Sequence, residues 1–261
     1  MNDLFKKLGK KVTMKRIWFT AFLLSLNLLK AENNPPEKVL FVGNSFTFYF
    51  NMPLVVESMA KEKGVVIDIH QSTAGGASLK DHWTGKKNLK TVERIKKGGF
   101  DTIVLQDYST NPLKKTKESI QYFNKFIDLA HSLNAKVLIY STWTYPAMKP
   151  EKYLDKDPIN IALRPLVGDS VSIVPVGKAF RLFQDRYPNV AIFTSDNKHP
   201  SPVGTYLAAC LFMQTLIGKS PSGLYRRYDR KDEGGKKIFL GMVEKSDAKK
   251  CQELIIGMTE N

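Results

Sequence analysis

A serine at the end of an apolar run and an Asp–His pair far downstream are the residues best suited to do chemistry in this chain. Ser45 follows shortly after the apolar segment Leu40–Val42, and Asp196 and His199 stand three residues apart. A serine hydroxyl becomes a good nucleophile when an imidazole removes its proton, and a carboxylate fixes the tautomer of that imidazole. The three residues therefore predict acyl transfer with Ser45 as nucleophile, His199 as base and Asp196 as the group that orients it.

The elements that must position these residues follow from the hydropathy pattern. Apolar runs typical of strands alternate with amphipathic segments typical of helices. This alternation predicts a three-layer α/β/α sandwich around a mostly parallel five-stranded sheet, because parallel strands need crossover helices. The expected strands are Val39–Val42, Val65–His70, Thr102–Leu105, Val137–Tyr140 and Val171–Val176. The expected helices are Met52–Lys63, Leu79–Lys97, Lys117–Leu133, Lys178–Tyr187 and Ser201–Ile217.

Polar and glycine residues follow several of these strands. Ser45 comes after the first strand, Gly75 and Gly76 after the second, and Gln106 directly after the third. Catalytic groups of parallel sheets gather at the carboxyl ends of the strands, so we expect these residues at one edge of the sheet. The segment from Tyr225 onward has no clear pattern.

Three blocks of the sequence resemble those of the SGNH (GDSL-like) hydrolases. Residues 43–47, Gly-Asn-Ser-Phe-Thr, resemble the nucleophile block, with Asn in place of the more usual Asp. Residues 72–79 resemble the glycine block, and residues 196–200, Asp-Asn-Lys-His-Pro, resemble the final block. The blocks occur in the expected order. The resemblance implies one hydrolase domain over residues 37–261, with the SGNH-hydrolase or flavodoxin-like arrangement of the sheet.

The resemblance also implies an oxyanion hole. Its donors would be the main-chain N–H of Ser45, the main-chain N–H of Gly75 or Gly76, and the side chain of Gln106. One such donor stabilises a transition state by roughly 3–4 kcal/mol. The third block of the family usually supplies an Asn, and Gln106 carries the same amide on a stem one methylene longer. The choice between the glycines, and the role of Gln106, stay open at this point.

Residues beside the nucleophile and after neighbouring strands are candidates for substrate binding. They are Asn44, Phe46, Tyr108 and Trp143. Aromatic faces suit sugar rings and acyl chains alike, and packing in the core is the alternative for these rings. The leading function is an exported serine esterase that hydrolyses O-acyl esters, with O-acetyl esters of carbohydrates as the leading substrate class. The alternatives are a lysophospholipase or thioesterase of the same fold, and a catalytically inactive carbohydrate- or envelope-binding domain.

The first 31 residues predict export. A basic stretch ends at Arg16, the apolar run Ile17–Leu29 follows, and Ala31 offers a small residue for cleavage. The run is short for a membrane span, which needs about 20 apolar residues, and its layout is that of a secretory signal peptide. An uncleaved N-terminal anchor and a start at Met14 are the alternatives. Either way we expect a periplasmic, secreted or envelope-associated protein.

Composition limits the partners. The chain has 261 residues, 43% of them hydrophobic, and a formal charge of +15. Residues 1–31 carry seven basic side chains against Asp3, which leaves +9 for the rest. That positive charge could attract anionic polysaccharide or lipid headgroups. The alternative is that the charged side chains are only solvated by water. No motif indicates nucleic-acid binding, and membrane contact is expected during export only. No metal or other cofactor is expected, since no Cys/His cluster occurs. A disulfide between Cys210 and Cys251 and the oligomeric state stay open.

Overall fold

The computed structural model describes residues 35–259, and its centre is a five-stranded sheet. All neighbouring strands are parallel, in the order β2-β1-β3-β4-β5. The strands are β1 (Glu37–Gly43), β2 (Ile67–Thr73), β3 (Thr102–Leu105), β4 (Lys136–Ser141) and β5 (Val171–Pro175). The predicted α/β fold is therefore confirmed. The signal or anchor predicted for residues 1–31 lies outside the described residues.

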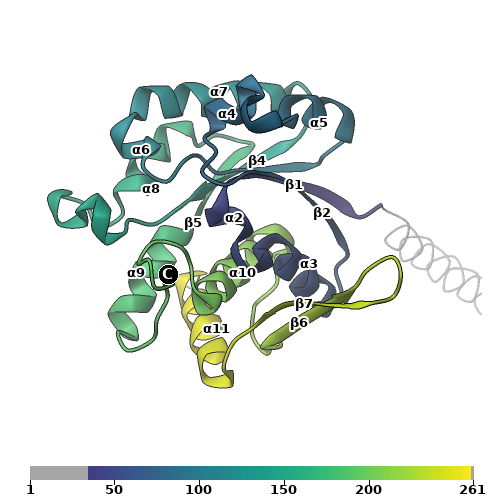
Figure 1. Cartoon of the computed structure of the whole chain (residues 1–261), viewed down its shortest axis with the longest axis vertical. Coiled ribbons are helices and arrows are strands. Elements are labelled where there is room, and N and C mark those ends of the chain that lie inside the picture. Colours follow the sequence, from purple (N-terminus) through teal and green to yellow (C-terminus); the bar gives the residue numbers. More distant parts are fainter. Residues whose placement is uncertain (1–34, 260–261) are drawn as a thin grey trace, which may run out of the picture. The chain divides into compact units, whose positions relative to one another are not determined.

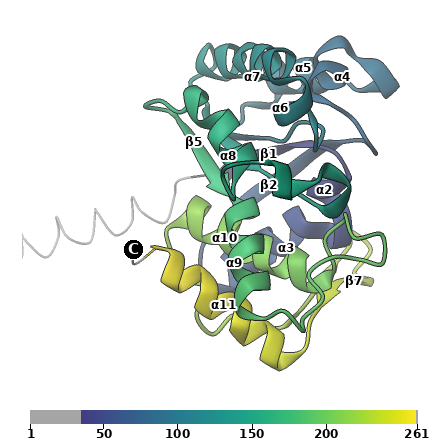
Figure 2. The ribbon, with the colours of Figure 1, turned by 90° about the vertical axis from the view of Figure 1, so that its left-hand side faces the viewer.

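Helices cover both faces of the sheet (Figure 1). On one face lie α4 (Leu79–Thr84), α5 (Thr91–Gly98), α6 (Asn111–Lys114) and α7 (Thr116–His131). On the other face lie α3 (Met52–Glu62), α9 (Val176–Arg186), α10 (Pro202–Ile217) and α11 (Lys245–Thr259). The view turned by 90° shows the same two layers (Figure 2). The short helix α8 (Pro158–Leu163) packs against α6.

Burial on both faces explains the composition of the central elements. The four residues Val39–Val42 of β1 are fully buried, as expected for a parallel strand with helices on both sides. Helix α10 is buried continuously from Gly204 to Met213, which fits a helix that is apolar all round. Cys210 of α10 and Cys251 of α11 are both buried free thiols, so the structure contains no disulfide between them.

On either side of the glycine turn, the structure differs from the sequence-based expectation. The single helix expected over Leu79–Lys97 is two helices, because Gly85 has φ +70° and ends α4 with a left-handed residue. The second strand begins at Ile67 and continues to Thr73, three residues past its predicted end. The glycine turn therefore follows it immediately.

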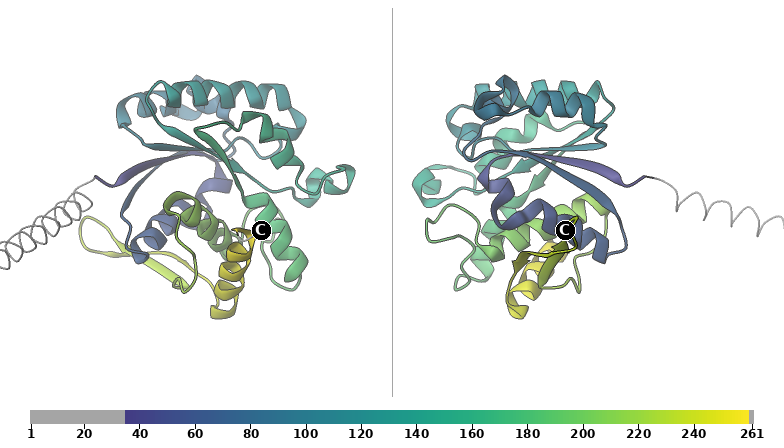
Figure 3. Two further views of the ribbon diagram at one scale, coloured as in Figure 1. Left: turned by 180° about the vertical axis from the view of Figure 1, so that it is seen from behind. Right: turned by 45° about the vertical axis from the view of Figure 1, so that its right-hand side comes forward.

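The segment from Tyr225 onward forms a hairpin and a helix. Strands β6 (Arg227–Lys231) and β7 (Lys237–Met242) pair in antiparallel fashion and lie beside α3 (Figure 3). Strand β6 is rich in charged residues and lacks an apolar alternation, so its pattern gives little signal. Within residues 35–259, no helix has the length and apolar character needed to cross a membrane.

The strand order reverses at β1. The chain leaves β1 for β2 on one side and then returns to place β3 on the other side of β1. Ligands of open α/β sheets bind at such a reversal, outside the carboxyl ends of the strands. Gly43 ends β1 and Leu105 ends β3, so Ser45 and Gln106 lie at this reversal.

Candidate active site

Ser45 begins a short helix directly after β1. Helix α2 (Ser45–Phe48) is capped by Asn44, whose Oδ1 accepts a hydrogen bond from the Phe46 N–H at 3.1 Å. The Nδ2 of Asn44 donates to the carbonyl of Ala77 at 2.9 Å, which ties the nucleophile turn to the glycine turn. Ser45 itself is half-buried. The cap therefore fixes the backbone while leaving the Ser45 hydroxyl accessible.

The structure brings Ser45, His199 and Asp196 together. Ser45 Oγ lies 2.8 Å from His199 Nε2, and His199 Nδ1 lies 2.5 Å from Asp196 Oδ2. Both distances are hydrogen-bond distances. Because the carboxylate can only accept, His199 Nδ1 carries the proton and Nε2 faces the serine hydroxyl as an acceptor. This tautomer is the one that a general base for Ser45 needs.

A closed turn holds Asp196 in place. Its Oδ1 accepts hydrogen bonds from Thr194 Oγ1 at 2.7 Å and from the N–H groups of Lys198 and His199, each at 2.9 Å. The N–H of Thr194 in turn donates to the carbonyl of His199 at 2.9 Å. Ser201 then caps α10 by accepting from the N–H groups of residues 203 and 204. The Asp–His pair is thus positioned by the start of a buried helix.

The pKa of Asp196 is lowered well below its usual range. The hydrogen bond from the His199 side chain is the main cause, and the bonds from the His199 N–H, Thr194 and Lys198 act in the same direction. These bonds therefore favour the ionised form of the carboxylate. An ionised carboxylate beside Nδ1 stabilises the imidazolium that forms when His199 takes a proton.

Two aromatic rings fix the plane of His199. The Tyr49 ring stacks on the imidazole with centroids 4.3 Å apart and planes 11° apart, and the Phe46 ring meets it edge-on at 5.3 Å. The His199 side chain keeps 17% of its surface exposed. The sequence did not single out Tyr49 for this role, although it stands in the aromatic run 46–50 after the nucleophile.

Three main-chain N–H groups beside the nucleophile are uncommitted. Within residues 35–259, the N–H groups of Ser45, Gly75 and Gly76 donate to no other protein atom. Gly76 has φ +61° and Gly75 does not have a positive φ. The carbonyl of Gly43 accepts from Ala74 N–H at 3.3 Å, so the glycine turn is tied to the end of β1. The choice between Gly75 and Gly76 as an oxyanion donor stays a prediction.

Gln106 is fully buried beneath the nucleophile turn. Its Oε1 accepts from the Asn44 N–H at 2.9 Å and from Thr47 Oγ1 at 3.0 Å, and its Nε2 donates to the carbonyl of Asp107. The Gln106 side chain thus holds the Asn44 backbone before Ser45 and the Thr47 hydroxyl after it. A direct oxyanion role for Gln106 stays a prediction, because the structure assigns these three bonds to its amide.

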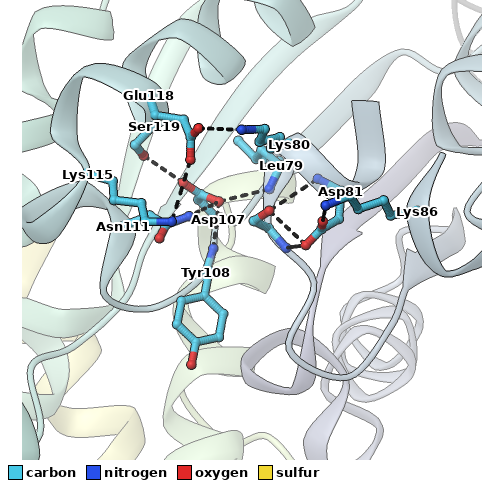
Figure 4. A network of polar contacts seen from close by, with 11 residues as sticks. Leu79, Lys80, Asp81, Lys86, Asp107, Tyr108, Asn111, Lys115, Glu118 and Ser119 are labelled. Carbon is cyan, nitrogen blue, oxygen red and sulfur yellow. Dashed lines mark hydrogen bonds and ion pairs between the residues drawn. The ribbon is translucent and has the colours of Figure 1, made fainter. Parts of the chain in front are cut away.

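The neighbouring Asp107 anchors the exit of the glycine turn (Figure 4). Its Oδ1 accepts from the Leu79 N–H at 2.8 Å, from the Tyr108 N–H at 2.7 Å and from Asn111 Nδ2 at 3.3 Å, and its Oδ2 accepts from Ser119 Oγ at 2.7 Å. Burial raises the pKa of Asp107, and these bonds oppose that rise. The carboxylate therefore joins α4, α6 and α7 to the end of β3.

The predicted substrate-binding residues differ in accessibility. Asn44, Phe46 and Trp143 are each 2% exposed, whereas Tyr108 is partly exposed. Phe46 stacks on Trp143 at 4.6 Å, and Trp143 Nε1 donates to the carbonyl of Lys198 at 3.0 Å. Phe46 and Trp143 therefore pack against the loop that carries Asp196 and His199, and a direct substrate contact by either ring stays a prediction.

Within residues 35–259, no cluster of three His, Cys, Asp or Glu side chains is arranged to bind a metal.

No family model and no curated protein matches this sequence. Solved structures match its fold. One is a DUF4886 family protein from Bacteroides uniformis, with a TM-score of 0.67 and 17% identity over 87% of this chain and 95% of that one. Another, from Slackia heliotrinireducens and assigned to the SGNH hydrolases, has a TM-score of 0.59 and 23% identity over 70% and 100%. An acetyl xylan esterase has a TM-score of 0.55 and 16% identity over 69% and 100%. The chain is therefore similar to SGNH hydrolase and esterase structures, and it has their α/β fold.

Proposed function

We propose that this protein is a serine esterase that hydrolyses O-acyl esters through an acyl-enzyme on Ser45. The observation that carries the proposal is the chain of two short contacts, Ser45 Oγ to His199 Nε2 at 2.8 Å and His199 Nδ1 to Asp196 Oδ2 at 2.5 Å. These atoms lie at the reversal of the strand order, where ligands of such sheets bind.

The first half of the reaction forms the acyl-enzyme. Ser45 Oγ attacks the ester carbonyl carbon while its proton passes to His199 Nε2. Asp196, already ionised, stabilises the resulting imidazolium through Nδ1–H. The imidazolium then gives its proton to the departing alcohol oxygen as the ester C–O bond breaks. The acyl group remains on Ser45.

The second half releases the acid. His199 removes a proton from a water molecule, which attacks the acyl carbonyl, and the proton returns to Ser45 as the acyl bond breaks. The free N–H groups of Ser45 and of Gly75 or Gly76 are the proposed donors to the oxyanion of both intermediates. The hydrogen bonds of Asn44 to Ala77 and of Gln106 to Asn44 would hold these N–H groups at fixed positions relative to one another.

We propose O-acetyl esters of carbohydrates as the substrate class. The support is the resemblance of the sequence blocks together with the predicted export, and the structural likeness to an acetyl xylan esterase is compatible with it.

We also propose that the protein is exported, because residues 1–31 have the layout of a secretory signal peptide. It predicts that the mature protein from an expressing bacterium begins after Ala31, and Edman sequencing of that protein tests it; a chain that keeps residues 1–31 would favour the anchor.

A specific cavity favours longer acyl chains as the second candidate. An apolar cavity of about 170 Å³ is lined by Phe50, Val55, Pro202 and Gly241 among others. Phe50 follows Tyr49, which stacks on His199. A Cβ on Gly241 would meet Val55 and the Phe50 carbonyl at ordinary contact distances of 3.8 and 3.9 Å. Gly241→Val should therefore narrow this cavity and lower octanoyl-ester hydrolysis relative to acetyl-ester hydrolysis if acyl chains enter it.

The deciding experiment compares Ser45→Ala with the wild type on 4-nitrophenyl esters from acetate to octanoate. We expect Ser45→Ala to lower kcat by about 10³-fold or more, because the residues of such a site act as a unit. Ser58→Ala is the matched control, since among residues 35–259 the Ser58 hydroxyl bonds only to the Leu54 carbonyl of its own helix. Activity retained in Ser45→Ala would reject the mechanism. A folded wild type without activity on any ester would favour the binding-domain alternative.

A further inference from the structure

A lysine between the two triad residues of the final block has an unusual environment. The Lys198 Nζ lies over three aromatic rings, at 5.9 Å from the Phe46 centroid, 5.8 Å from Tyr108 and 5.4 Å from Tyr145. All three distances fall within the range of cation–π attraction. Phe46 directly follows the nucleophile Ser45, and its ring contacts His199. The Lys198 ammonium therefore lies near a ring that also touches the catalytic base.

The side chain of Lys198 is not needed to hold its loop. Its N–H donates to Asp196 Oδ1 at 2.9 Å and its carbonyl accepts from Trp143 Nε1 at 3.0 Å, so the loop contacts belong to the main chain. Among residues 35–259, no carboxylate lies within 4.0 Å of the Lys198 ammonium, and Lys198 as a whole is partly exposed. An ammonium group carries three donors and no acceptor. The aromatic rings therefore orient a cation whose hydrogen-bond donors remain free.

A second lysine, Lys87 in the turn Lys86–Asn88 after α4, contacts the glycine turn. Lys87 Nζ donates to the Gly75 carbonyl at 2.5 Å. A Cβ on Gly76 would lie 3.8 Å from Lys87 Nζ and 3.9 Å from Tyr108 Cε2. Lys87 also has a positive φ of 57°, a conformation that costs energy in a residue other than glycine and is often found at functional sites. Lys87 Nζ thus contacts the glycine turn that carries the candidate oxyanion donors, and Lys198 Nζ lies 5.8 Å from the centroid of the neighbouring Tyr108 ring.

A cavity adjoins the loop that carries Lys198, with the preceding residue Asn197 in its wall. Tyr145 and Asn197 line a cavity of about 520 Å³ at the carboxyl ends of β4 and β5, together with Tyr153 and Phe193. The charged side chains lining it are Glu151, Asp155, Lys156, Asp157, Lys178 and Arg181. Arg181 is paired with Asp157 at 2.7 Å. Aromatic and charged groups in a cavity of this size suit a sugar residue with polar substituents.

We propose that Lys198, assisted by Lys87, binds an anionic group on the alcohol portion of the substrate, so that the natural substrate is an O-acylated acidic carbohydrate. The anionic group is a carboxylate or a phosphate. This inference rests on the proposed function: an acetyl group carries no charge of its own, so the anion must belong to the alcohol that leaves. The charge of +9 outside residues 1–31 would attract such a substrate.

The test compares three acetyl esters that differ in one substituent. The esters are 3-acetoxybenzoate, 3-acetoxyphenyl phosphate and the neutral 3-acetoxybenzamide, and each kcat/KM is divided by the rate of the ester in buffer alone. We expect the wild type to prefer at least one anionic ester about tenfold or more, the usual size of one charge-assisted hydrogen bond. The anion that is preferred identifies the group as a carboxylate or a phosphate.

Variants at Lys198 show whether this residue supplies the preference. Lys198→Met keeps the apolar stem and should lower the anionic-to-neutral ratio about tenfold, whereas Lys198→Arg should keep most of it. Lys87→Met should lower the ratio by a smaller factor. Lys125→Met is the matched control. Lys125 lies on helix α7, and its Nζ also lies over two aromatic rings, 5.5 Å from the Trp83 centroid and 4.8 Å from the Tyr122 centroid. It should leave the ratio unchanged. The wild-type ratio should also fall in 1 M salt.

The outcomes separate this inference from the proposed function. A wild type without preference, or a Lys198→Met variant that slows all three esters by the same factor, would overturn the inference. The second result would mean that Lys198 acts at the reacting carbonyl or only on the loop. If no ester is hydrolysed, or hydrolysis survives Ser45→Ala, the proposed function fails and the inference fails with it.

Discussion

Gly43 allows a close approach that any side chain would prevent. A Cβ at this position would lie 2.4 Å from Thr47 Oγ1 and 2.6 Å from Gln106 Oε1. Both neighbours are fully buried, so neither side chain can turn toward solvent to make room. Gly43→Ala must therefore displace Gln106 from the Asn44 N–H that it braces. The nucleophile turn then moves as well.

The expected cost of Gly43→Ala has two parts. Overpacking a well-packed core costs about 1–3 kcal/mol, and we expect about 2–3 kcal/mol because both contacts are fully buried. For a chain of this size that corresponds to a Tm lower by roughly 5–10 °C. A shift of Ser45 by about 1 Å relative to His199 should lower kcat/KM by about 10²-fold.

Thermal melting and hydrolysis of 4-nitrophenyl acetate measure the two parts of this prediction. Gly168→Ala is the matched control, since a Cβ there meets nothing within 4 Å and its φ is not positive. We expect that control to keep the wild-type Tm and rate. A Gly43→Ala variant that also keeps both would refute the argument that Gln106 braces the nucleophile turn.

Three further predictions concern buried polar groups and thiols. Asp107→Ala should lower the free energy of unfolding by about 3 kcal/mol or more, because four donors, three of them in buried hydrogen bonds, lose their acceptor; a loss below about 1 kcal/mol in urea unfolding would contradict this. Burial lowers the pKa of His82, so below about pH 6.5 the unfolded state binds more protons than the folded state. The free energy of unfolding should therefore decrease as the pH is lowered through this range, and His82→Gln should weaken that dependence. Burial raises the pKa of Cys210 and Cys251, so Ellman's reagent should detect no thiol in the native protein and two in urea, whereas none in urea would indicate a disulfide.

The parts of the fold that the sequence predicts well are those with strong local patterns. Strand β3 has the bounds that its apolar run predicts, and α3 and α10 begin and end within one residue of prediction. The hairpin β6–β7 gives no such signal, because β6 is mostly charged, and both strands contact α3, which lies far away in the sequence. The break after α4 depends on three residues with positive φ, Gly85, Lys87 and Asn88, within a pattern that otherwise favours a helix.

The candidate site shows a similar division. Residue types and their spacing are enough to propose Ser45, Asp196 and His199 together, because each chemical role requires a particular side chain. The supporting contacts are different: the stacking of Tyr49 on His199 and the three rings around Lys198 join segments distant in the chain. No local pattern encodes such contacts. The same holds for Gln106, whose residue type suggests an oxyanion donor while its packing places it beneath the nucleophile turn.

The central claim is that the hydroxyl of Ser45 is an activated nucleophile. A fluorophosphonate probe incubated with the folded protein and followed by peptide mass spectrometry tests it most directly, because such a probe reacts with a serine whose proton is removed by a neighbouring base. We predict stoichiometric labelling on Ser45, strongly slowed in His199→Ala and absent after denaturation. A folded protein that remains unlabelled, or that is labelled at another serine, would contradict the account.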